Sequence, residues 1–202
     1  MRVTAEIRLA TRERILETSR QLFAENGFEA ATTRGIAEKA EIGVGTLFNY
    51  FPTKEAIVAT LAAEAVEATL KGFAFDAAEG DSLAEELFAF IAAGLRKLKP
   101  FRKQLPVVLE TALSPLAAGG NGEVQTLRVL HLETASQIIW RRHGGELSPV
   151  ALQIYWSLYT GLLLFWANDR SLRQEDTLAL LDHSMEMFSN WLKSQVQIDK
   201  SI

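Results

Sequence analysis

Residues 43–55 read GVGTLFNYFPTKE and place three aromatic side chains within four consecutive positions. The run does not alternate apolar and polar residues, as a half-buried strand does, and it is shorter than an ordinary core helix. Pro52 ends it, because the residue before a proline avoids the helical conformation. The segment therefore predicts a helix of about two turns that buries one side and leaves the other for a partner.

A helical wheel divides this predicted helix into two faces. Leu47 and Phe51 lie one turn apart and share a narrow face suited to anchoring. The opposite face and its flanks carry Gly45, Thr46, Phe48, Asn49 and Tyr50. A hydroxyl, an amide, a phenol and a bare backbone can lie on phosphates and reach the base edges of a duplex. A short aromatic helix is also commonly part of a core, and that alternative would bury the same polar groups.

The segments before this helix complete a helix-turn-helix pattern. Residues 11–26 have helical periodicity and end at Asn26-Gly27, a typical left-handed stop. Thr32 and Thr33 offer hydroxyl caps for a short second helix, and Glu41-Ile42 makes the tight turn to the third. The sequence predicts a motif at about residues 31–50 within a DNA-binding domain of residues 1–55.

Residues 11–55 resemble the DNA-binding domain of the TetR family of bacterial transcriptional regulators. The matching pieces are ILETSRQLFAENGF, TT-x-x-x-IA-x-x-A, G-T-L-F-N-Y-F and P-T-K-E, in that order, over about a quarter of the chain. The resemblance implies a homodimer that places two recognition helices in successive major grooves of a palindromic operator. It also implies a repressor that a small-molecule effector releases from DNA.

Carried over by position, the resemblance assigns DNA contacts to seven residues. They are Thr33, Gly45, Thr46, Phe48, Asn49, Tyr50 and Lys54. By their chemistry, Thr46 and Asn49 are the candidate base contacts, whereas Tyr50 and Lys54 are the candidate phosphate contacts. Thr33 would also bond a phosphate, and Phe48 would pack on a sugar or a thymine methyl group.

Three residues depart from the family pattern. Glu41 stands where the family commonly has glycine, so a carboxylate and backbone strain are expected in the turn. Gly35 weakens the second helix, and Val44 occupies a position that is often polar. These departures leave one alternative open, namely a dimeric helical ligand-binding or adaptor protein that does not bind DNA.

The charge of the chain is uneven along its length. The net charge is −4, although DNA-binding proteins are usually basic. Residues 1–20 hold five arginines against three glutamates, whereas residues 56–202 hold 13 basic and 17 acidic side chains. The excess of acid therefore lies outside the predicted DNA-binding domain.

The remaining residues, 56–202, predict a helical effector-binding and dimerisation domain. Strand patterns are absent throughout the 202 residues, so the fold class is all-α. The chain has no cysteine, its three histidines are far apart, and it lacks the common catalytic motifs. We expect neither catalysis nor a metal or cofactor, and we expect a cytoplasmic protein.

Residues 150–167 contain no charged side chain over 18 positions. This length is at the lower limit for a membrane span, but polar residues interrupt it and its aromatics lie in the middle. A helix that is apolar on all sides can also lie between its own core and a partner subunit. The resemblance favours a dimer interface and no membrane, with these candidates: Leu152, Trp156, Tyr159, Leu163, Trp166, Leu181, Met185, Phe188 and Leu192.

The same domain offers candidates for an effector pocket. His131 falls on an apolar helical face, where a histidine is either a satisfied core residue or a ligand contact. The other candidates are aromatic or aliphatic: Phe73, Phe88, Ile91, Trp140 and Tyr155. Their chemistry favours an apolar or aromatic effector.

Overall fold

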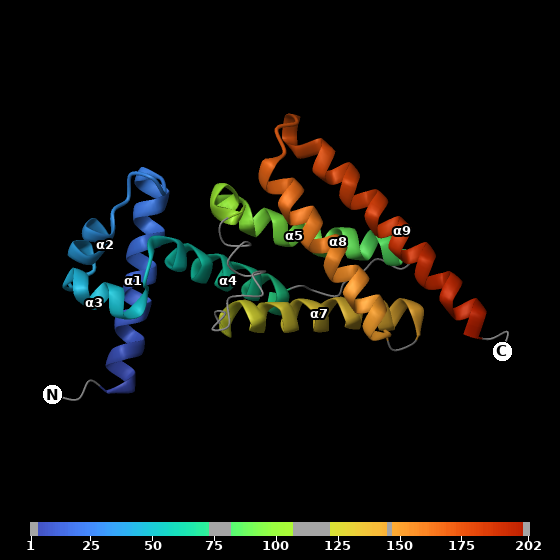
Figure 1. The fold of residues 1–202 in the computed structure, drawn as a ribbon, viewed down its shortest axis with the longest axis horizontal. Helices are drawn as coiled ribbons and strands as arrows, with labels where there is room; N and C mark the ends of the chain where they lie inside the picture. The colour runs from blue at the N-terminus through green and yellow to red at the C-terminus, as the bar shows by residue number, and fades with distance from the viewer. Residues whose placement is uncertain (1–3, 73–81, 107–121, 145–146, 200–202) are drawn as a thin grey trace. The chain divides into compact units, whose positions relative to one another are not determined.

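The computed structural model of the chain describes residues 4–72, 82–106, 122–144 and 147–199 (Figure 1). Every regular element in these ranges is helical, which confirms the predicted all-α class. The elements are α1 (Ala5–Asn26), α2 (Thr33–Lys39), α3 (Val44–Tyr50), α4 (Lys54–Gly72), α5 (Leu83–Leu98), η1 (Lys99–Gln104), α7 (Gly122–His143), α8 (Pro149–Asn168), η2 (Leu172–Gln174) and α9 (Glu175–Asp199).

The chain divides into two compact units, Met1–Ala62 and Ala63–Ile202. The division falls inside α4, a few residues beyond the boundary at 55/56 that the sequence suggested. The first unit thus consists of α1, α2, α3 and the beginning of α4. The second contains the rest of α4 and the elements from α5 to α9.

The first unit is held together by a small apolar core. Ile15, Leu16, Ile36 and Leu47 are completely buried in it. Helix α1 begins at Ala5, six residues before the predicted start, because the side chain of its N-cap Thr4 accepts a hydrogen bond from the backbone N–H of Ile7 at 3.4 Å. The first turns of α1 are therefore ordered helix with exposed side chains.

The second unit is built around α5, which packs against both α7 and α9. A capping box between Ser82 and Glu85 starts α5, and Leu87 and Phe90 bury its apolar side. The carboxylate of Glu86 is also buried, and Arg141 and Arg142 at the end of α7 donate hydrogen bonds to it. This pairing joins α5 to α7 and compensates the buried charge.

Helix α8 is, among the described residues, the helix long and apolar enough to cross a membrane by length and composition. Its mean hydropathy is 1.4, and a third of the window, 33%, is buried within the chain. This is weak support for a membrane span, because core and interface helices meet the same criteria.

Candidate nucleic-acid interface

Helix α3 is attached to the first unit by two side chains. Leu47 is completely buried and Phe51, its C-cap, is 4% exposed, as the wheel predicted. The N–H of Phe51 donates to the carbonyl of Leu47 at 2.9 Å, so the backbone turn itself holds the two anchors together. Since both anchors lie on one side, the rest of this seven-residue helix is free to face outward.

The outward side of α3 carries the predicted DNA contacts. Gly45, Thr46 and Asn49 are exposed, Phe48 is 45% exposed and Tyr50 is half-buried. Apart from the adjacent residues and the backbone of α3 itself, no atom of the described residues lies within 4 Å of the position that a Cβ on Gly45 would take. The fold of the chain therefore does not require glycine there, whereas close approach of an external backbone would.

The turn between α2 and α3 contains the residue that departs from the family pattern. Glu41 has φ 55°, in the left-handed region that favours glycine. Hydrogen bonds from Glu41 N to Glu38 O (3.1 Å) and from Ile42 N to Ala37 O (3.0 Å) hold the turn in this conformation. The expected backbone strain at Glu41 is therefore present, and the structure gives its cause.

The two threonines at the start of α2 have different positions. Thr32 is the N-cap, and its hydroxyl accepts a hydrogen bond from Gly35 N at 3.0 Å. Thr33 is the first helical residue and is half-buried. Because Thr32 fills the cap, the hydroxyl of Thr33 is not needed for it, and a phosphate contact by Thr33 stays a prediction.

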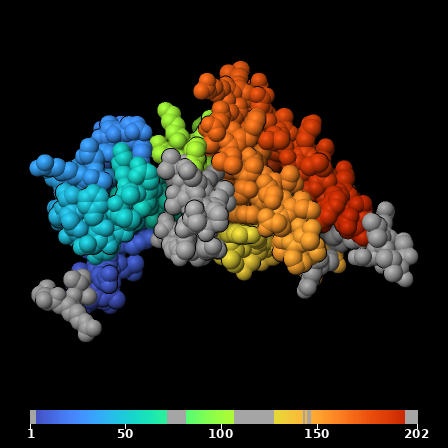
Figure 2. All heavy atoms as spheres, in the orientation of Figure 1, coloured from blue at the N-terminus to red at the C-terminus, as the bar shows by residue number. Residues whose placement is uncertain are grey.

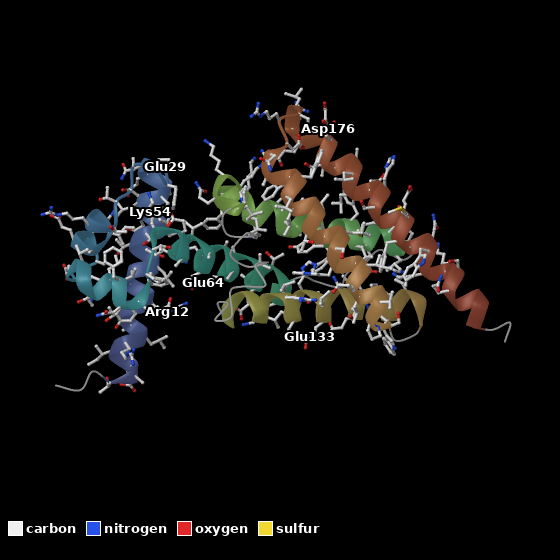
Figure 3. The ribbon with its side chains drawn as sticks, viewed as in Figure 1. Arg12, Glu29, Lys54, Glu64, Glu133 and Asp176 are labelled. Atoms are coloured by element: carbon white, nitrogen blue, oxygen red, sulfur yellow. The ribbon has the colours of Figure 1, made fainter. Side chains whose placement is uncertain are left out.

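Lys54 has a structural role that the sequence did not reveal. Its Nζ donates to the carbonyls of Phe28 (2.7 Å) and Ala31 (3.1 Å) and lies 4.0 Å from the centre of the Phe28 ring. The ammonium thus ties the first turn of α4 to the loop between α1 and α2 (Figure 3). An ammonium has three N–H donors, so one remains for the predicted phosphate contact.

Arg12 was not among the predicted contacts, yet it lies beside α3. Its guanidinium carbon is 5.6 Å from the centre of the Phe51 ring, at the C-terminal end of α3 (Figure 3). The sequence signal was present in the arginine-rich start of the chain. Only the packing of α1 against the end of α3 shows where those arginines lie.

The predicted effector residues do not all come together. His131 is 4% exposed, its Nε2 lies 2.9 Å from Tyr155 Oη, and its ring centre is 3.9 Å from that of Tyr159. The Phe90 ring covers another side at 4.9 Å. Burial lowers the pKa of His131 to about 3 and raises the pKa of Tyr155 and of Tyr159, so all three groups are neutral near pH 7.

These contacts account for His131 as a satisfied core residue, and an effector contact by this group stays a prediction. Ile91 is buried on α5, next to Phe90 in sequence, and Phe88 is half-buried. Trp140 is 60% exposed, so it lies outside the buried cluster, because it points away from the core at the end of α7. Phe73 lies outside the described residues.

The structure corrects seven of the nine predicted interface residues, because they are buried within their own chain. Leu152 and Trp156 are half-buried and stay predictions. The seven are Tyr159, Leu163, Trp166, Leu181, Met185, Phe188 and Leu192. A side chain enclosed by its own core cannot also pack against a second chain, so these residues form the inner faces of α8 and α9.

The opposite side of α8 remains exposed and largely apolar, and α9 also exposes one large apolar side chain near its middle. On α8, Val150, Leu164 and Phe165 are 63%, 42% and 43% exposed, and on α9 Met187 is 60% exposed. Figure 2 shows α8, in orange, as part of the surface on the side viewed. A shallow open hollow of about 520 Å³ lies on this face, lined by Pro149, Val150, Gln153, Ile154, Ser157 and Leu158. We call the side of α8 that carries Val150, Leu164 and Phe165 the outer face of α8.

Comparisons with known proteins agree with the geometry of the first unit. Residues 15–61 match the family model of bacterial regulatory proteins of the tetR family. Over 63 residues the chain is 38% identical to UidR, an HTH-type transcriptional regulator of Escherichia coli (strain K12), which covers 31% of this chain and 32% of UidR. It is 44% identical over 54 residues to the HTH-type transcriptional repressor KstR of Rhodococcus jostii (strain RHA1), 26% of each protein. The matched segments thus span about a third or less of these relatives.

The fold is similar over nearly the whole chain. The crystal structure of Thermus thermophilus FadR, a TetR family transcriptional repressor, in complex with lauroyl-CoA superposes with a TM-score of 0.64. The match covers 88% of this chain and 92% of FadR at 20% identity, which speaks for the fold alone. Residues 15–61 of this chain are thus similar to the N-terminal domain of the tetR family of bacterial regulatory proteins, and the chain as a whole has a fold similar to that of FadR, a solved TetR family repressor.

Proposed function

We propose that the chain is a sequence-specific DNA-binding transcriptional regulator whose recognition element is α3. The observation that carries this proposal is the two-sided character of α3. Leu47 and Phe51 fix it to the core, while Thr46 and Asn49 are exposed on its other side. Asn49 supplies an amide that can pair with the edge of an adenine, and Thr46 supplies a hydroxyl for a base or a phosphate.

The regulator would act as a homodimer on a palindromic operator. Two-fold symmetry of the protein requires two half-sites about one helical turn of DNA, or a multiple of it, apart. We propose that the subunit contact lies on the outer face of α8, because the chain itself leaves the large apolar side chains of Val150, Leu164 and Phe165 uncovered there. Such a complex of DNA and regulator belongs in the cytoplasm.

The regulator would be a repressor that releases DNA when a small molecule binds the second unit. The support is the apolar and aromatic composition of its interior around Ile91, His131 and Tyr155. FadR, which has the same fold, is a repressor that binds lauroyl-CoA, a ligand with a long apolar chain. We therefore propose an effector that is apolar or aromatic, and no catalytic role for the protein.

Selection of bound sequences from a random DNA pool tests the proposal. The wild-type chain is expected to enrich one palindromic motif, and anisotropy titrations should give tighter binding to that motif than to shuffled DNA. Asn49→Ala should lose about 1–3 kcal/mol of discrimination at one base pair of each half-site. Glu133→Ala, on the exposed side of α7, is the control that leaves the motif unchanged.

Two outcomes would contradict the proposal in different ways. If the chain enriches no motif and binds shuffled DNA as weakly as an acidic protein without DNA affinity does, it is a helical ligand-binding or adaptor protein. A chain that enriches a motif that Asn49→Ala and Thr46→Ala leave unchanged would be a DNA-binding protein that uses a surface other than α3.

A further inference from the structure

The first two turns of α1 form a helical segment that the proposed interface leaves unused. They carry exposed side chains, including Arg8 and two large apolar residues, Ile7 (50% exposed) and Leu9 (61% exposed). Figure 1 shows these turns extending past α3. Packing against the core of the first unit does not account for these two turns, because their side chains are exposed.

Arg8 lies in line with the core-facing side of α1. At about 100° per residue, Arg8, Arg12, Ile15 and Ser19 fall on one stripe. Ile15 and Ser19 are completely buried, and Arg12 is partly buried against Phe51. Arg8, one turn further toward the N-terminus, is exposed. The residues of this stripe are therefore wholly or partly buried up to the C-terminal end of α3, and the next residue beyond it is a solvent-exposed arginine.

The geometry of a duplex places a phosphate near that point. Helix α3 has seven residues and is roughly 10 Å long, while the major groove is about 12 Å wide. A helix of this length that crosses the groove would therefore have a phosphate backbone near each end. The backbone at the Phe51 end would lie toward Arg12, and Arg8 follows about 6 Å further along α1.

The charges around Arg8 leave its guanidinium available. The residues one turn away on the same helix are Thr4, Ala5, Thr11 and Arg12, none of which is acidic. The neighbouring Arg12 lies on the same stripe, and its guanidinium pairs with Glu13 at 3.7 Å. A guanidinium in such surroundings binds a phosphate as a bidentate donor.

We propose that Arg8 is a phosphate contact outside the helix-turn-helix motif, and that it extends the footprint of each protomer on the operator beyond the bases that α3 reaches. The proposal rests on the proposed DNA-binding function. It assigns to the start of α1 a role in affinity and placement on the duplex, with base selection left to Thr46 and Asn49.

The salt dependence of binding tests this role. Arg8→Ala in the full-length chain should weaken binding to the selected operator and to unrelated DNA alike, by roughly tenfold per protomer at 0.1 M salt. The slope of log affinity against log salt should fall in magnitude by about two for a dimer. Hydroxyl-radical footprints should lose protection at the outer edges of the operator and keep it at the centre.

The matched control is Arg14→Ala. Arg14 is exposed on the same helix, carries the same charge and points about 120° away from the stripe. It should leave the slope and the footprint at wild-type values. Helical circular dichroism of both variants establishes that the comparison is between folded proteins.

The possible outcomes separate this inference from the proposed function. If the wild-type chain binds the operator and Arg8→Ala retains its salt slope and outer footprint, the role of Arg8 is overturned and the regulator stands. An equal loss of slope in Arg14→Ala would also overturn it, since net charge alone would then explain the change. A wild-type chain that binds no DNA would instead overturn the proposed function.

Discussion

Helices α3 and α8 both leave one side uncovered, but the two uncovered sides differ in chemistry. The outward side of α3 is short and mostly polar, with Thr46 and Asn49 exposed. The outer face of α8 is long and apolar, with Leu164 and Phe165 each more than 40% exposed. A hydrated, charged duplex suits the first surface, whereas the second is suited to the dry surface of another protein.

Amphipathicity identifies the buried face of α3 but does not identify the buried face of α8. In α3 the two apolar anchors stand apart from polar neighbours, so the sequence alone separates the inside from the outside. In α8 apolar residues surround the helix, and the separation depends on which side its own core covers. A weaker sequence pattern does mark the outer face of α8, since the polar or small residues Gln153, Ser157 and Gly161 lie on it.

A charge on the outer face of α8 is expected to have the largest effect. Leu164→Asp would bury an unpaired carboxylate in each half of the proposed dimer contact, at a cost of about 3–5 kcal/mol. The dimer dissociation constant should therefore rise more than about a hundredfold, as measured by analytical ultracentrifugation. Val129→Asp, at an exposed apolar position on α7, is the control. An unchanged dimer with Leu164→Asp would place the subunit contact elsewhere.

Truncation of the α3 anchor should destabilise the first unit. Leu47→Ala removes a completely buried side chain and is expected to lower the free energy of unfolding by about 2–5 kcal/mol. Val44→Ala, at a position 37% exposed on the same helix, should cost less than about 1 kcal/mol. Urea unfolding measures both. Equal effects of the two substitutions would contradict the two-sided assignment of α3.

The pH dependence of unfolding should test the inner face of α8, because His131 of α7 is buried against it. The pKa of His131, in contact with Tyr155 and Tyr159, is about 3 in the folded chain, below its ordinary value of 6.5. The unfolded chain therefore takes up a proton first as pH falls. Stability from the neutral imidazole is complete above pH 6.5 and should decrease by about 1.4 kcal/mol per pH unit below it.

Between pH 6.5 and 5 this amounts to a loss of about 2 kcal/mol, measured by urea unfolding at each pH. His131→Gln removes the titrating group and should remove this part of the pH dependence. If the variant keeps the full wild-type slope, His131 is not the group responsible, and its buried, neutral state is contradicted.

Relief of the strained turn should give the smallest effect. Glu41→Gly suits the left-handed backbone at φ 55° and is expected to raise the free energy of unfolding by up to about 1 kcal/mol. It also removes a carboxylate from the motif, so DNA binding should not weaken. Glu38→Gly, within helix α2, is the matched control and should destabilise by about 1 kcal/mol. A Glu41→Gly variant less stable than wild type would contradict the strain.

Much of the first unit could be predicted from the sequence, because its order of caps, short helices and anchors is local. The burial of Leu47 and Phe51 and the exposure of Asn49 followed from spacing alone. The ties of Lys54 to Phe28 and Ala31 did not, because they join residues more than twenty positions apart. The faces of α8 and α9 could not be assigned either, since their apolar residues satisfy a core and an interface equally well.

The absence of cysteine in the sequence makes one measurement of the central claim direct. Asn49→Cys creates a single thiol on the outward side of α3, to which an iron chelate that cleaves DNA can be attached. We predict cleavage within each half-site of the selected operator, on both strands across one major groove. Glu133→Cys with the same chelate should give none there. Equal cleavage by both variants, or none from position 49 on bound operator, would contradict the placement of α3 in the groove.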